Sequence, residues 1–133
     1  MTSTPSTPGV SGLLQIAMPV QEIDRAVAFY RDVIGLPFLF QAGNLAFFDL
    51  NGVRLMLDIP ESEEFRHPGS VLYFRVPDLR AGYEAMRGGG AEFIGEPHLI
   101  HSDGRQDLWM AFFRDGEGNV HALASEVPAG TVV

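Results

Sequence analysis

Apolar residues in the first half of the chain follow spacings that predict one helix among several strands. Leu13–Val20 is a short apolar run containing a proline near its end, which is typical of a strand. In Gln21–Ile34 the apolar residues recur every three or four positions, so a helix with one apolar face is expected, and Gly35 suits its left-handed end. Three further apolar runs, separated by Gly-Asn and Asn-Gly turns, predict strands at Pro37–Gln41, Leu45–Leu50 and Val53–Ile59.

The second half of the chain predicts the same order of elements again. Ser70–Val76 reads as a strand, and Asp78–Gly88 as a helix that three glycines end. Three more strands are expected at Ala91–Gly95, Asp107–Arg114 and Asn119–Ser125. An offset of 56 residues places Val20 on Val76 and carries the apolar face of the first helix onto that of the second. We interpret this as an internal duplication, because element order and turn signals match as well as the helices.

Length and composition predict one domain of two such modules. The chain has 133 residues, which suits a single domain with its own core. Residues 1–12 are rich in Thr, Ser, Pro and Gly and are expected to form a flexible N-terminal tail. Residues 13–126 form the domain, with modules at 13–59 and 70–125, and residues 127–133 a C-terminal tail. Halves this small are expected to share a core.

Charge and composition exclude several classes of partner. A formal net charge of −8 argues against nucleic acid or an anionic membrane surface, since both attract clustered Lys and Arg. The sequence has no cysteine, which excludes disulfides, thiolate metal sites and thiol nucleophiles. It shows neither a signal-peptide pattern nor an apolar run of about 18 residues. We therefore expect a cytoplasmic protein.

Two stretches carry a resemblance to a known family. Gln15–Val20 followed by Ile23–Leu36, with its Phe-Tyr-x-Asp-x-x-Gly-Leu stretch, resembles the opening of the vicinal oxygen chelate superfamily, which includes glyoxalase I, extradiol dioxygenases and the fosfomycin- and bleomycin-resistance proteins. Asp115–Asn119 resembles its usual turn before the last strand, with Gly116 in place of a proline. The resemblance implies an α+β fold in which two βαβββ modules form an eight-stranded, partly open barrel with the helices outside.

The resemblance also implies where a divalent metal would bind. Family members that use Zn, Ni, Fe or Mn hold it with His, Glu and sometimes Gln from the first and last strand of each module. Strand alternation places Gln15, Met56, Val71 and Ala122 at those four positions. Only Gln15 is a suitable donor, and a catalytic cation usually needs about three protein ligands, so no metal is expected. A shift of one residue in register would instead bring His121 into the cavity.

The same alternation selects candidate ligand-binding residues around the cavity. Arg54, Tyr73 and Arg75 are expected on the cavity side. Either arginine could bind a carboxylate, or it could pair with Asp58 or Asp49 or point to solvent. Aromatic residues, Trp109 among them, line a pocket or fill the core. His98 is a candidate acid or base over the cavity mouth, or part of a solvated loop, whereas a solvated loop is favoured for His101 and Asp107. The candidate set is Gln15, Arg54, Met56, Tyr73, Arg75, His98 and Trp109.

Three functions remain open from the sequence. The first is a protein that binds a small organic molecule in its cavity without the usual catalytic metal, as a homodimer like the bleomycin-binding branch of the family. The second is a metal-dependent lyase, isomerase or dioxygenase whose ligands are displaced to other residues such as His98 or His121. The third is a regulatory domain whose cavity is filled by its own side chains. Fold alone does not decide between them.

Overall fold

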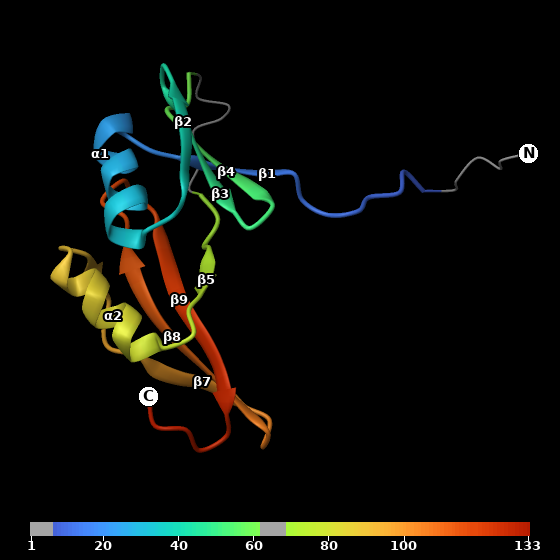
Figure 1. Cartoon of the computed structure of the whole chain (residues 1–133), viewed down its shortest axis with the longest axis vertical. Coiled ribbons are helices and arrows are strands. Elements are labelled where there is room, and N and C mark those ends of the chain that lie inside the picture. Colours follow the sequence, from blue (N-terminus) through green and yellow to red (C-terminus); the bar gives the residue numbers. More distant parts are fainter. Residues whose placement is uncertain (1–6, 62–68) are drawn as a thin grey trace, which may run out of the picture.

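The computed structural model describes residues 7–61 and 69–133, which form an α+β fold with two sheets (Figure 1). Its elements in chain order are β1 (Gln15–Pro19), α1 (Ile23–Ala28), η1 (Phe29–Ile34), β2 (Phe38–Ala42), β3 (Leu45–Leu50), β4 (Val53–Asp58), β5 (Tyr73–Arg75), α2 (Leu79–Gly88), β6 (Glu92–Phe93), β7 (His98–Ser102), β8 (Gln106–Arg114) and β9 (Val120–Pro128). No helix of the described residues is long and apolar enough to cross a bilayer.

Each module contributes one sheet. Module 1 (residues 13–59) forms a sheet in the order β1-β4-β3-β2, and module 2 (residues 70–125 with the end of β9) forms one in the order β5-β9-β8-β6, with β7 also paired to β8. In the described part of the chain the two sheets do not close into a barrel. Figure 1 shows α1 and α2 on the same side of the sheets. We call the opposite side of each sheet its open face.

Two sequence predictions about module 2 need correction. His98–Ser102 is not a solvated loop but strand β7, which hydrogen-bonds to β8 and is exposed along its length. Asp107 is not solvated either: its side chain is buried and accepts a hydrogen bond from the Gly130 backbone N–H at 3.0 Å. The described strands therefore number nine rather than eight.

The register of the strands confirms the internal repeat. In module 1 the parallel pair β1–β4 places Ala17 opposite Met56, and in module 2 the parallel pair β5–β9 places Tyr73 opposite Ala122. Ala17 and Tyr73 are separated by the 56-residue offset that the sequence predicted. Both modules thus place their first strand beside their last strand in the same way.

Helices cover the inner faces of the sheets and build two apolar cores. The Gln21–Ile34 segment begins at Ile23 as α1 and continues as the wider π-helical turn η1, which ends at Gly35 with φ of 85°. One core packs α1 and η1 on β1, β3 and β4, and the other packs α2 on β8 and β9. Phe29 contacts both cores, so the modules share apolar packing as well as chain connectivity.

A buried polar network also joins the modules. Tyr30 of module 1 donates its hydroxyl proton to Asp115 Oδ2 at 2.7 Å and lies 2.9 Å from His121 Nε2. His121 Nδ1 accepts from the Leu72 backbone N–H at 3.1 Å, so Nε2 carries the proton in the neutral ring and donates it to Tyr30. Asn119 adds a bond across the junction to the Pro19 carbonyl at 2.8 Å. These residues fix the modules against each other.

A single carboxylate of module 2 completes the start of α1. Glu117 is buried, and its Oε1 accepts from the backbone N–H groups of Gln21 and Glu22 at 2.9 and 2.7 Å. Its other oxygen accepts from Arg25 Nε. The start of a helix leaves backbone N–H groups without partners and carries a partial positive charge. The Glu117 carboxylate accepts hydrogen bonds from these groups, and its negative charge is favourable beside the positive end of the helix.

Candidate functional site

Three predicted site residues meet on the open face of the module 1 sheet. Gln15 on β1 lies opposite Arg54 on β4, and Arg54 Nε donates to Gln15 Oε1 at 2.8 Å. The amide nitrogen of Gln15 donates weakly to Met56 Sδ at 3.6 Å. Leu55 and Leu57, which alternate with them on β4, are fully buried on the helix side. Period-two alternation thus holds the polar side chains on the open face.

Aromatic rings support this cluster. Arg54 lies over the ring of Phe47, with Cζ 5.4 Å from the ring centre, and Phe47 stacks on Phe40 with centres 4.5 Å apart. A guanidinium over an aromatic face gains from the negative charge of that face. The cluster therefore presents a cation beside a flat apolar surface.

Two more candidate residues meet on the open face of module 2. Tyr73 on β5 and His98 on β7 both pack against Phe112 on β8, with ring centres 6.3 and 6.2 Å away. The His98 ring is exposed, and its Nδ1 lies 3.1 Å from the Glu96 carbonyl oxygen. The Tyr73 side chain is exposed as well. This second cluster offers an aromatic surface with a hydroxyl and an imidazole.

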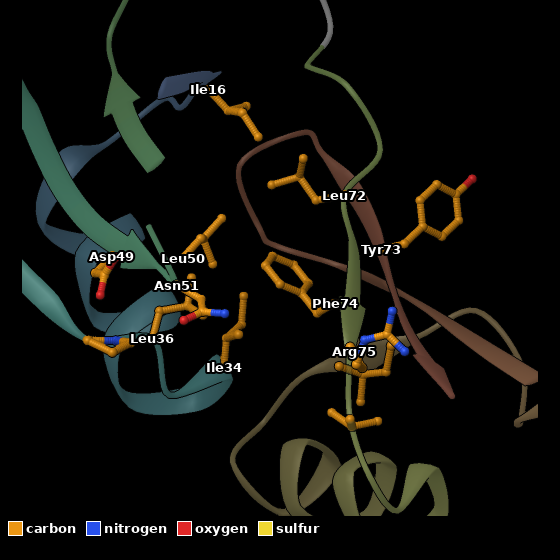
Figure 2. A pocket seen from close by; sticks show the side chains of 13 residues that line it. Ile16, Ile34, Leu36, Asp49, Leu50, Asn51, Leu72, Tyr73, Phe74 and Arg75 are labelled. Atoms are coloured by element: carbon orange, nitrogen blue, oxygen red, sulfur yellow. The ribbon is translucent and has the colours of Figure 1, made fainter. Parts of the chain in front are cut away.

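A cleft of about 740 Å³ separates the two modules (Figure 2). Figure 2 shows Leu72 and Phe74 on the side of β5 that faces module 1, while the Tyr73 ring is directed away from that side. The module 1 wall comes from β1, the end of η1 and the β3–β4 turn. The lining side chains are mostly apolar, with Asp49, Asn51 and Arg75 as polar members. Its volume lies in the range of about 300–1,000 Å³ of small-molecule sites.

Gln15 and Arg54 are not among the residues that line the cleft. Ile16, next to Gln15 on β1, lines the cleft, and so does Asp49, which lies directly opposite Arg54 in the β3–β4 pair. Tyr73 and Arg75 belong to the cleft on the module 2 side, where Arg75 also pairs with Glu126 at 3.6 Å. Of the predicted site residues, Tyr73 and Arg75 thus border the cleft, while Gln15, Arg54 and Met56 form their cluster on the open face of module 1.

Other predicted positions lie elsewhere. Trp109 is partly buried on the helix side of β8 and packs on the second core, and its Nε1 has no hydrogen-bond partner among the described residues. His121 is fully buried on the helix side, as the favoured register predicted. Burial is the main cause that lowers its pKa, against a smaller opposing effect of Asp115. His101 lies exposed on β7.

The four positions that the resemblance assigns to a metal do not fit one. Ala122 is fully buried opposite Tyr73, and Val71 precedes β5 with an aliphatic side chain. The amide oxygen of Gln15 already accepts from Arg54, and Met56 offers a soft thioether. No group of three or more His, Cys, Asp or Glu among residues 7–61 and 69–133 could hold a metal ion.

Sequence reasoning missed the β3–β4 turn and the end of η1 as parts of the site. Asn51, with φ of 53°, and the adjacent Gly52 were predicted only as a hairpin turn. The turn borders the cleft because the second module packs beside it. The spacing of apolar residues along the sequence does not reveal such a contact between modules. The sequence shows that Ile34 and Leu36 at the helix end are apolar, but it does not show that they line the cleft.

Comparisons with known proteins identify the family. The model of the Glyoxalase/Bleomycin resistance protein/Dioxygenase superfamily matches residues 12–130. A glyoxylase-like domain-containing protein of Didymella fabae is 29% identical over 124 residues, covering 83% of this chain and 90% of that protein. A metallothiol transferase FosB of Shouchella clausii is 27% identical over 129 residues, covering 92% and 83%.

Solved structures agree on the fold. An integron cassette protein from V. cholerae superposes with a TM-score of 0.73 at 17% identity, covering 90% of this chain and 98% of that one. A lactoylglutathione lyase from Agrobacterium tumefaciens superposes with a TM-score of 0.66 at 21% identity, covering 87% and 94%. The chain belongs to the Glyoxalase/Bleomycin resistance protein/Dioxygenase superfamily.

Proposed function

We propose that this protein binds a small organic molecule at the cleft and the adjoining open faces, without a catalytic metal. The observation that carries the proposal is the hydrogen bond that occupies the amide oxygen of Gln15. Its oxygen, the one suitable donor among the four family positions, is held by the Arg54 guanidinium. The open face of module 1 offers stacked aromatic rings and the cleft offers apolar side chains, both typical of sites for small organic ligands.

The proposal includes a homodimer that covers the open faces. Six apolar or aromatic residues on or next to β2, β5 and β7 expose between 42% and 55% of their surface: Leu39, Phe40, Val71, Tyr73, Leu99 and Ile100. Contiguous exposed apolar surface usually marks an interaction site. A second copy placed against these faces would enclose a cavity between sheets of different chains and supply the partly open barrel that the family resemblance implies.

The experiment combines metal analysis with a ligand screen. The full chain is purified without affinity metal or chelator, its metal content is measured by elemental analysis, and its melting temperature is recorded with a library of small aromatic and amphipathic compounds. We expect less than about a tenth of a metal equivalent per chain and stabilisation by some compounds, since a ligand that binds only the folded state raises its stability.

One result would replace the proposal. Stoichiometric Zn, Ni, Fe or Mn, together with stabilisation by metal alone, would favour a metal-dependent lyase, isomerase or dioxygenase with displaced ligands. The name of the FosB relative keeps this alternative open. A matched pair of variants tests the site: Tyr73→Ala, which removes an exposed ring at the border of the cleft, should lose the ligand-induced shift, while Arg31→Ala, an exposed residue paired with Asp32, should keep it.

A further inference from the structure

We propose that the guanidinium of Arg54 is the fixed cation of this site, and that the ligand is an aromatic organic anion whose carboxylate, or a similar two-oxygen head group, binds Arg54. The inference rests on the proposed function, because it names the charge and shape of the molecule bound there. It follows from how Arg54 is held, from which contacts it lacks and from what surrounds it.

Three neighbours hold the Arg54 side chain in place. Its Nε bonds to Gln15 Oε1 at 2.8 Å, and the same amide is oriented from its other end by Met56 Sδ. The guanidinium carbon lies 5.4 Å from the centre of the Phe47 ring. An arginine fixed by an amide and a ring loses less freedom on binding than one that moves in solvent. Such preorganisation is expected of a binding group.

The remaining donors of Arg54 are unused. A guanidinium has five N–H donors, and Nε supplies only one of them. Within residues 7–61 and 69–133, Arg54 forms no ion pair, and its one hydrogen-bond acceptor is the neutral amide of Gln15. Five other arginines pair with carboxylates, while Arg80 and Arg105 resemble Arg54 in forming no ion pair within the described residues; the five are Arg25, Arg31, Arg75, Arg87 and Arg114. Two terminal nitrogens of Arg54 are therefore left for a carboxylate, which matches their planar spacing.

Acidic side chains near Arg54 limit its attraction for an anionic ligand to short range. Asp49 lies opposite Arg54 in register, but its Oδ1 accepts from the Gly52 backbone N–H at 3.1 Å. Asp58 lies on the same face further along β4. With a net charge of −8 on the chain, no long-range attraction draws an anion to the site. The anion has to gain its affinity from direct bonds to Arg54 and from apolar contact.

The surroundings define the rest of the ligand. Phe47 and Phe40 form a stacked pair beside Arg54 on the open face of module 1. A flat apolar body attached to the carboxylate would lie against these rings. A divalent cation at Gln15 would compete with Arg54 for the same oxygen and would be repelled by its charge. Arg54 thus supplies the positive charge that a metal supplies in other members of the family.

The test compares a charged and a neutral probe of the same shape. Binding of 2-naphthoate and of 2-naphthylmethanol to the full chain is titrated by calorimetry at pH 7.5, for the wild type and for four variants. We expect wild type to bind 2-naphthoate at least tenfold more tightly than the alcohol. Arg54→Ala should remove this preference, and Arg54→Lys should lose several-fold because an ammonium cannot form the paired bonds. Gln15→Ala should weaken binding a few-fold by freeing Arg54.

Arg31→Ala is the matched control, since Arg31 is an exposed arginine of η1 that is already paired with Asp32 and lies outside the site. It should change the Kd for 2-naphthoate by less than twofold. Arg54 is exposed, so its variants are expected to fold, which circular dichroism checks. Equal affinity for both probes, or undiminished binding by Arg54→Ala, would overturn the inference while leaving the proposed function intact. Stoichiometric metal in the purified protein would overturn the proposed function and the inference with it.

Discussion

At the scale of single residues, the junction between the modules depends on a neutral histidine. His121 is fully buried, and its unprotonated Nδ1 is needed as the acceptor for the Leu72 N–H. Protonation would put a second proton on the ring, break that bond and bury a charge. Burial accordingly lowers the pKa of His121. Tyr30 shows the same environment, since burial and Asp115 raise the pKa of its hydroxyl.

This arrangement predicts a fall in stability in mild acid. In the unfolded chain His121 titrates near 6.5, while its folded pKa is lower, so the unfolded state binds more protons below 6.5. The free energy of unfolding should be steady above about pH 7 and fall towards pH 5, with a slope approaching about 1.4 kcal/mol per pH unit. Urea titrations at pH 7.5, 6 and 5 measure it.

A variant and a control assign the effect. His121→Gln should lower the stability at every pH but flatten its dependence between pH 7.5 and 5, because carboxylates titrate mostly below this window. His101→Asn, on exposed β7, should keep the wild-type fall. Identical urea midpoints for the wild type at pH 7.5 and pH 5 would rule out a buried neutral histidine at the junction.

At the scale of elements, the pattern of apolar residues predicted those strands and helices that have one buried face. In β4 the buried Leu55 and Leu57 alternate with more exposed neighbours, and the predicted open-face positions Arg54 and Met56 are correct. Strand β7 has no buried face, so it lacks the alternation that would reveal it. Trp109 was not assigned to a side because both faces of β8 carry large apolar residues. The fold was therefore more predictable than the site.

The two helices begin in different ways, which gives a prediction with an internal control. Asp78 caps α2, where its side chain accepts from the Ala81 backbone N–H at 3.0 Å, whereas Glu22 at the start of α1 makes no such bond within the part of the chain that the structure describes. Asp78→Ala should lower the free energy of unfolding by about 1 kcal/mol. Glu22→Ala should change it by less than about 0.5 kcal/mol, since Glu117 already serves that helix end. Equal losses in urea denaturation would contradict this assignment.

At the scale of the whole molecule, contacts between residues far apart in sequence decide how the modules sit. Glu117 reaches Gln21 and Glu22 across more than 90 residues, and Tyr30 reaches His121 across 91. The sequence predicted two modules and a shared core, but local spacing carries no information on such long-range polar bonds. For the same reason it could not predict that the sheets of the described residues stay separate.

The proposed dimer predicts the molar mass of the protein in solution and a substitution that should dissociate the dimer. Light scattering after size-exclusion chromatography should give twice the 14.6 kDa of one chain. Phe40→Glu, at a position 49% exposed on β2, should produce monomer because it would bury an unpaired charge between copies. Val132→Glu, at a position 96% exposed near the C-terminus, should leave the mass unchanged. A wild-type mass of one chain at micromolar concentration would contradict the dimer.

The shortness of β5 has a consequence for solubility. Among the described strands it pairs only with β9, so its other edge leaves backbone groups of Tyr73 and Arg75 without a strand partner. Unpaired edges are templates on which chains add to one another and precipitate. A stretch of three residues that ends in a charged arginine is a poor template of this kind. The short β5 edge therefore gives further chains little opportunity to extend this sheet by strand pairing.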